Sequence, residues 1–107
     1  MELWTGLVCL VADPACKVFR RFGKGKGAYV NVVAWAQSAK HFEQRVATMS
    51  RELDCIVREM EHVELLEAAL QRDGWAEELF TMRATAERQP NDVVFGTFHI
   101  WTQSDLN

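Results

Sequence analysis

The sequence predicts an α+β fold, a two-layer sandwich in which about four mixed or antiparallel strands carry helices on one face. Three observations support this prediction. Residues 28–36 alternate between small and bulky side chains, and residues 39–53 repeat apolar side chains at helical spacing. The chain has 107 residues, of which 49% are hydrophobic. A chain of this size can bury a core without disulfides or metal, so we expect residues 1–107 to form a single domain.

Residues 28–36 predict the central strand, around which the rest of the sheet is organised. Successive side chains of a strand point to opposite faces. The two faces are Ala28, Val30, Val32, Ala34 and Ala36 on one side, and Tyr29, Asn31, Val33 and Trp35 on the other. The first face is small and aliphatic, which suits a packed helix. The second is aromatic with one amide, which is not typical of a solvent-exposed face.

Two segments precede this strand. Residues 2–12 predict an interior strand that is apolar on both faces and ends at Asp13–Pro14. Residues 15–22 predict a short helix, and residues 23–27 alternate glycine with lysine. A phosphate-binding loop is one interpretation of this basic segment. We favour a plain turn, because the glycines lead into a strand and not into a helix N-terminus.

The clearest helix follows, with Ser38 as its predicted N-cap. Its inner stripe is Ala39, Phe42, Val46, Met49 and Leu53, while Ser50 is assigned to the outer face. Residues 54–63 are ambiguous, because apolar side chains continue at helical spacing through Met60 and Val63. We favour a strand here over a continuation of the helix, since a helix of about 35 residues is long for a small domain.

The C-terminal part predicts two helices and a last strand. The helices are residues 63–72 and 75–88, with a stop at Asp73–Gly74. Residues 93–102 predict a strand, with Val93, Phe95, Thr97, His99 and Trp101 on one face.

Charge is unevenly distributed along the chain, although the net charge is only −3. Residues 14–42 hold six bases and no acid, whereas residues 43–107 hold thirteen acids and six bases. This pattern indicates either a dipolar surface that steers a charged partner or a basic loop that folds against acidic helices.

The compartment is inferred from the cysteines and the N-terminus. Cys9, Cys16 and Cys55 are odd in number and contain no Cys-x-x-Cys pair, which favours a reducing cytosol. Glu2 stands where a signal peptide carries a basic residue, and no apolar run approaches the ~20 residues of a membrane span. We therefore expect a soluble, cytoplasmic protein.

The aromatic face of the sheet is the predicted functional surface. Its candidate ligand-binding or interface residues are Trp4, Tyr29, Asn31, Trp35, Phe95, His99 and Trp101. If helices cover only one face, a second copy of the chain, a ligand or residues 15–22 must cover the other. Homodimerisation is our first hypothesis, because aromatic residues dominate interface cores. A small apolar ligand oriented by Tyr29, Asn31 and His99 is the alternative.

Enzymatic activity is the less favoured class. His99 is the one candidate acid or base, but the sequence places no nucleophile or orienting carboxylate beside it. We predict no cofactor and no metal, since only Glu59 and Glu61 of the Glu59–His62 segment would converge on one strand face. Nucleic-acid binding is disfavoured, because the basic loop lacks interleaved aromatic residues. Acidic helices that cap a basic protein, as an immunity-type inhibitor does, are a further alternative.

The order of the elements resembles that of ferredoxin-type α+β proteins. This resemblance covers most of the chain and implies only an architecture, with helices on one face of a four-stranded sheet. The chain is also similar in general character to small bacterial proteins of mobile gene cassettes and to toxin-immunity proteins. Neither resemblance transfers a functional residue.

Overall fold

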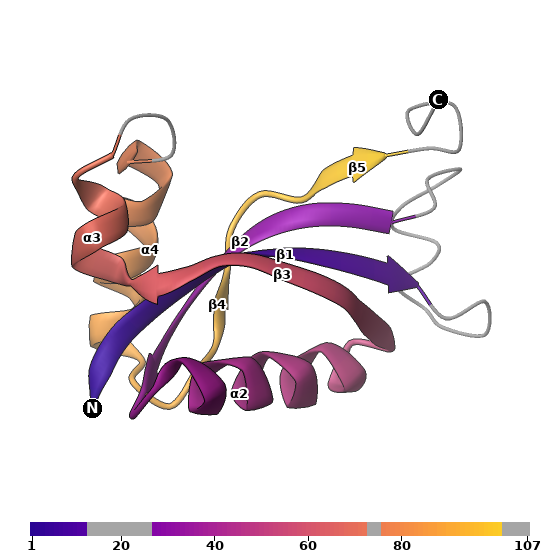
Figure 1. Ribbon diagram of the computed structural model, residues 1–107, viewed down its shortest axis with the longest axis horizontal. Helices are drawn as coiled ribbons and strands as arrows, with labels where there is room; N and C mark the ends of the chain where they lie inside the picture. Colours follow the sequence, from indigo (N-terminus) through magenta and orange to yellow (C-terminus); the bar gives the residue numbers. More distant parts are fainter. Residues whose placement is uncertain (13–26, 73–75, 102–107) are drawn as a thin grey trace.

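The computed structural model describes residues 1–12, 27–72 and 76–101, which form an open antiparallel sheet with helices packed against it (Figure 1). The strands are β1 (Glu2–Ala12), β2 (Gly27–Ala36), β3 (Cys55–Leu65), β4 (Val94–Phe95) and β5 (His99–Trp101). The helices of the described residues are α2 (Ala39–Glu52), α3 (Leu66–Leu70) and α4 (Ala76–Arg88). The sheet order is β3-β1-β2-β4, and β5 also pairs with β2. The α+β class is confirmed, with five strands instead of four, whereas the ferredoxin-like arrangement is not confirmed.

Strand β2 lies at the centre of the sheet, as predicted. It pairs with β1 over its whole length, and with β4 and β5 along its other edge. The predicted small-residue face is confirmed, because its five members belong to one buried cluster with α2. That cluster consists of Val8, Leu10, Ala28, Val30, Val32, Ala34, Ala36, Phe42, Val46 and Cys55.

Helix α2 forms where the apolar stripe predicts it. The Ser38 side chain accepts a hydrogen bond from the His41 backbone N–H at 3.1 Å, which satisfies one of the free donors of the first turn. Phe42 and Val46 are fully buried. The placement of Ser50 on the outer face is wrong: it is also fully buried, because spacings of four put it on the same side as Phe42 and Val46.

Strand β3 resolves the ambiguous segment in favour of the strand, and it runs further than predicted, to Leu65. Its pairing with β1 shifts register twice, once opposite Thr5/Leu7 and once opposite Cys9/Leu10. Each shift is a β-bulge that adds one residue to β3. As a result Val57, Met60 and Val63 all pack against the α2 cluster although they are three residues apart. The bulges therefore explain why this strand has a helix-like apolar period.

Helices α3 and α4 pack against the other face of β2. Val33 belongs to a second buried cluster with α3 and α4, formed by Leu66, Ala69, Leu79, Met82 and Ala86. The Trp35 side chain donates from Nε1 to the Ala86 carbonyl oxygen at 3.1 Å. The prediction of helices on one face only is wrong. The even-numbered residues of β2 pack in the α2 cluster, whereas Val33 and Trp35, which point to the other face, contact α3 and α4. Figure 1 shows α2 on one side of the strands, with α3 and α4 grouped at the end near the N-terminus.

The predicted last strand is split in two. Residues 96–98 separate β4 from β5, and the Gly96 N–H donates to the Asn31 carbonyl oxygen at 2.8 Å. Glu78 of α4 fills the gap and accepts from the Thr97 N–H at 3.0 Å. A Cβ atom on residue 96 would lie 1.9 Å from Glu78 Oε1, so a larger residue there would displace this carboxylate from Thr97.

Two predictions concern residues outside the described part of the chain, namely the short helix at 15–22 and the basic loop before Gly27. Within the described ranges, no helix is long and apolar enough to cross a membrane.

Candidate binding pocket

The second face of the sheet is organised in rows that cross the strands. Directly opposed residues of an antiparallel pair share a face. Read from β3 to β2, the rows are Glu59–Cys9–Tyr29, which His99 of β5 extends, then Glu61–Leu7–Asn31, and then Glu64–Thr5–Val33. Helices α3 and α4 cover the last of these rows, which ends at Val33. The Asn31 row therefore lies at the boundary between the part of this face that α3 and α4 cover and the part that they leave uncovered.

A pocket of about 250 Å³ lies at this boundary. The described residues that line it are Thr5, Gly6, Leu7, Asn31, His62, Ala69, Arg72 and Leu79. They come from β1, β2, the bulge of β3 opposite Thr5/Leu7, helix α3, the second residue after α3, and α4. The pocket is therefore assembled from segments that are far apart in the sequence.

Asn31 is a buried polar residue of this pocket, with only 6% of its surface exposed, and Thr5 is another, with 4% exposed. The Asn31 Nδ2 atom is buried and has no hydrogen-bond partner among the described residues. An unsatisfied buried donor costs about 1–3 kcal/mol. A central strand of a small sheet would be more stable with an apolar residue here, so the amide calls for an explanation beyond folding.

His62 is the strained residue of the pocket. Its φ angle is 55°, in the left-handed region that is uncommon for residues other than glycine. It lies where β3 contains the bulge opposite Thr5/Leu7. Asp54 is the other such residue of the described chain, but it occupies the tight turn between α2 and β3, where aspartate is common. Of these two residues, only His62 lines the pocket.

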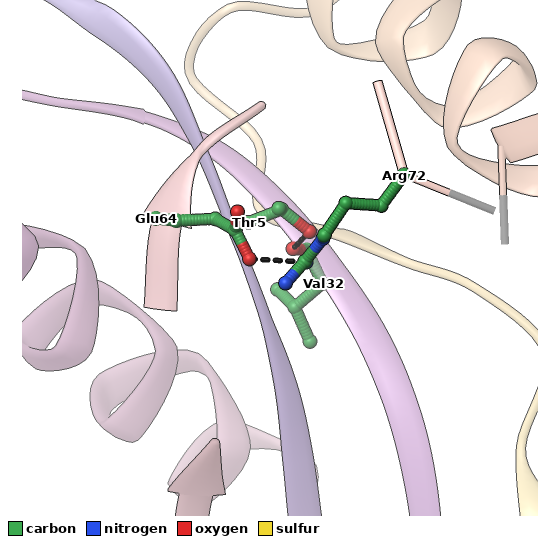
Figure 2. A network of polar contacts seen from close by, with 4 residues as sticks. All are labelled: Thr5, Val32, Glu64 and Arg72. Carbon is green, nitrogen blue, oxygen red and sulfur yellow. Dashed lines mark hydrogen bonds and ion pairs between the residues drawn. The ribbon is translucent and has the colours of Figure 1, made fainter. Parts of the chain in front are cut away.

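Polar contacts fix one wall of the pocket (Figure 2). The Thr5 hydroxyl donates to the Val32 carbonyl oxygen at 2.8 Å, so towards a ligand it can act only as an acceptor. The Arg72 guanidinium pairs with the Glu64 carboxylate. Their side chains are 54% and 22% exposed, so the pair adds little to stability and can be exchanged for another partner.

The structure separates the residues of the predicted aromatic face. Tyr29, Asn31 and His99 do share a face, and His99 is exposed on β5. The placement of Trp4 and Phe95 on that face is wrong, because both pack against the α2 cluster. Trp35 packs within the monomer against α4, and Trp101 pairs with Gly27 at the end of β5. The interruption at residues 96–98 is the reason that Phe95 and His99 do not share a face as a regular strand would require.

Tyr29 is held in its neutral form. Its pKa is raised above the ordinary value, first by charge repulsion from the facing Cys9 in its thiolate form, then by burial and a hydrogen bond with Cys9, and then by repulsion from the Glu59 and Glu61 carboxylates. The folded state thus binds the phenolic proton more tightly than the unfolded chain. The resulting stability is present below the ordinary tyrosine pKa and is lost as the pH rises through the folded-state pKa.

The titration of Tyr29 can be followed directly, because it is the one tyrosine of the chain. We expect the tyrosinate absorbance to rise with a midpoint above ~10 in the folded protein. Cys9→Ala should lower this midpoint, whereas Cys55→Ala, which alters a buried thiol in the α2 cluster, should not. A midpoint at the ordinary value in the unmodified protein would contradict the assignment.

Three residues of the pocket were not found from the sequence, namely Thr5, His62 and Arg72. The predictions placed His62 on a regular strand beside Met60, and Arg72 at the end of a helix. The spacing of three between Val57, Met60 and Val63 is a signal of bulges, but it could also be explained by a helix. The contacts of Arg72 depend on where α3 packs, which no local pattern reveals.

Among the described residues no group of three or more His, Cys, Asp or Glu side chains is placed to hold a metal ion. The chain matches no protein-family model, no curated protein and no solved structure.

Proposed function

We propose that this protein is a non-enzymatic binding protein whose site is the pocket beside Asn31. The observation that carries the proposal is that two costly features meet at one cavity. The Asn31 side chain holds a buried Nδ2 donor without a partner among the described residues, and His62 has a strained backbone. Local rules of stability are broken mainly at functional sites, where a bound ligand compensates for the cost.

The size of the pocket restricts the ligand. Sites for drug-sized molecules are about 300–1,000 Å³, so a pocket of about 250 Å³ suits a smaller compound. Leu7, Ala69 and Leu79 supply apolar wall, and Asn31 supplies the hydrogen bond that orients the ligand. This is the ligand-binding alternative from the sequence, with Asn31 retained and with His62 and Arg72 in place of Tyr29 and His99.

Methyl NMR tests this proposal, because the pocket has methyl groups on three elements. With a library of small metabolites, we expect at least one compound to shift the methyl signals of Leu7, Ala69 and Leu79 together. The Val46 methyls, buried on the opposite face, serve as the control and should not move. A library in which no compound moves the three pocket residues as a group would count against the proposal.

Self-association through the second face of the sheet is the second candidate function. It would use the part of that face that bears Tyr29 and that α3 and α4 do not cover. Ile56 supports it, because this residue is opposite Val11 on that face and is 55% exposed. Sedimentation velocity would detect the dimer, and Ile56→Asp should dissociate it. The interface would include Tyr29 and His99, but not Trp4, Trp35 or Phe95.

The enzymatic alternative based on His99 and the immunity-type alternative stay predictions. For the immunity-type alternative, the acidic residues Glu59, Glu61 and Glu64 of β3 share the second face of the sheet, where a basic partner would bind.

A further inference from the structure

We infer that the ligand of the Asn31 pocket is a small carboxylate, bound by the Arg72 guanidinium and the Asn31 amide. This inference rests on the proposed binding function and specifies the chemical class of the ligand. It follows from the donors and charges of the lining side chains, together with the contact that Arg72 makes in the absence of a ligand.

The lining of the pocket is rich in hydrogen-bond donors. Asn31 has an Nδ2 donor without a partner, and Arg72 has five N–H donors in a planar fork. Among the described lining residues, Arg72 carries the one permanent charge, and none is acidic. A ligand with acceptor oxygens and a negative charge is the chemical complement of this set.

The contact between Arg72 and Glu64 shows which geometry the guanidinium accepts. Its partner here is a carboxylate from the neighbouring strand β3, next to the pocket but not part of its lining (Figure 2). Here Arg72 Nη2 donates to Glu64 Oε2, and arginine frequently binds a carboxylate through a second, parallel hydrogen bond as well. A ligand carboxylate can replace that of Glu64 because the Arg72 side chain is 54% exposed, but Glu64 is only 22% exposed and would lose its counterion in the exchange. Glu64 therefore competes with the ligand carboxylate for the Arg72 guanidinium, and this competition limits the affinity for the ligand.

Thr5 adds a preference within the carboxylate class. Its proton is committed to the Val32 carbonyl oxygen, so its free lone pairs face a ligand as acceptors. A carboxylate that also carries a hydroxyl group can donate to Thr5 Oγ1. We therefore expect hydroxy acids to bind more tightly than the parent acids.

The test compares carboxylates with their neutral amides at constant ionic strength, which keeps the screening of charges equal. The probes are acetate, lactate and benzoate, each with its amide, and inorganic phosphate is a separate probe. Affinity is measured from the shifts of the Leu7 and Leu79 methyl signals. We expect each acid to bind at least about tenfold more tightly than its amide, and lactate to bind more tightly than acetate.

Variants identify the groups responsible. Arg72→Gln should weaken binding of the acids about tenfold and leave the amides unchanged, whereas Glu64→Gln should strengthen binding of the acids. The matched control is Arg83→Gln, which removes an arginine that pairs with Glu87 on α4 outside this pocket. It should have no effect on either series.

The outcomes separate the two levels of the argument. The carboxylate inference is overturned if acids and amides bind with equal affinity, or if Arg72→Gln leaves the affinity for the acids unchanged. Either result leaves the proposed binding function standing. Phosphate that binds as tightly as the best acid also overturns the carboxylate inference, in favour of a general anion site. If none of the acids moves the pocket methyls while neutral metabolites do, the ligand class is wrong. If nothing in either experiment moves them, both proposals are wrong.

Discussion

Phe42→Ala is expected to lower the free energy of unfolding by about 3–5 kcal/mol, the usual cost of emptying the site of a buried phenylalanine. Phe42 is fully buried and is the largest of the fully buried side chains. Its ring lies against Gly6 of β1, where an added Cβ would be 3.2 Å from Cε2 of the ring. Gly6 therefore supplies no side chain that can move into the cavity, so this side of it stays unfilled.

Urea unfolding followed by tryptophan fluorescence measures this change. Domains of this size are stable by about 5–15 kcal/mol, so the variant will be marginal near the lower limit. The matched control is Phe80→Ala, because Phe80 is 48% exposed on α4 and its ring contacts the Arg83 guanidinium at 5.0 Å. It should cost less than about 1 kcal/mol. Similar losses in the two variants would mean that α2 does not organise the main core.

Asn31→Leu is expected to change stability in the opposite direction and raise the free energy of unfolding by about 1–2 kcal/mol. Leucine has the same branched arrangement of heavy atoms as asparagine but contains no donor to leave unsatisfied. The pocket beside residue 31 has room for the larger methyl groups. The same variant should lose ligand binding, because it removes the amide that orients the ligand. A gain in stability with a loss of binding is typical of a functional polar residue in a core.

The control for Asn31→Leu is Gln44→Leu, which removes an exposed amide from the outer face of α2. Its effect on urea unfolding should stay within about 0.5 kcal/mol. If Asn31→Leu destabilises the protein, the amide has a structural partner, such as a bound water, and its retention needs no ligand.

The sequence predicted those features that local periodicity specifies. The alternation along residues 28–36 placed its five small side chains on the α2 face, and Ser38 marked the start of the helix. It failed where pairing with a neighbouring strand changes the count of residues. Phe95 was assigned to the aromatic face, yet it contacts the α2 cluster. Trp4 was assigned to that face as well, although the regular pairing of β1 with β2 sets it opposite Ala34 on the α2 face. For Phe95, the change of face at residues 96–98 depends on Glu78, which approaches from a different element.

The candidate site could be predicted only in part for the same reason. Asn31 was visible as an amide among apolar neighbours, and its face was assigned correctly. His62 and Arg72 were not, because the bulge in β3 and the packing of α3 are set by contacts with β1 and β2.

The sequence alone therefore determined the α+β class, the central strand β2 and the helix that covers its small-residue face, since period-two and helical patterns are local properties of the chain. Tertiary structure decided that helices also cover part of the second face and that the remaining cavity lies beside Asn31. The physical reason is that the positions of bulges and the packing of helices depend on contacts between segments that are far apart in the sequence. At this pocket those contacts leave a donor and a strained residue without compensation inside the fold.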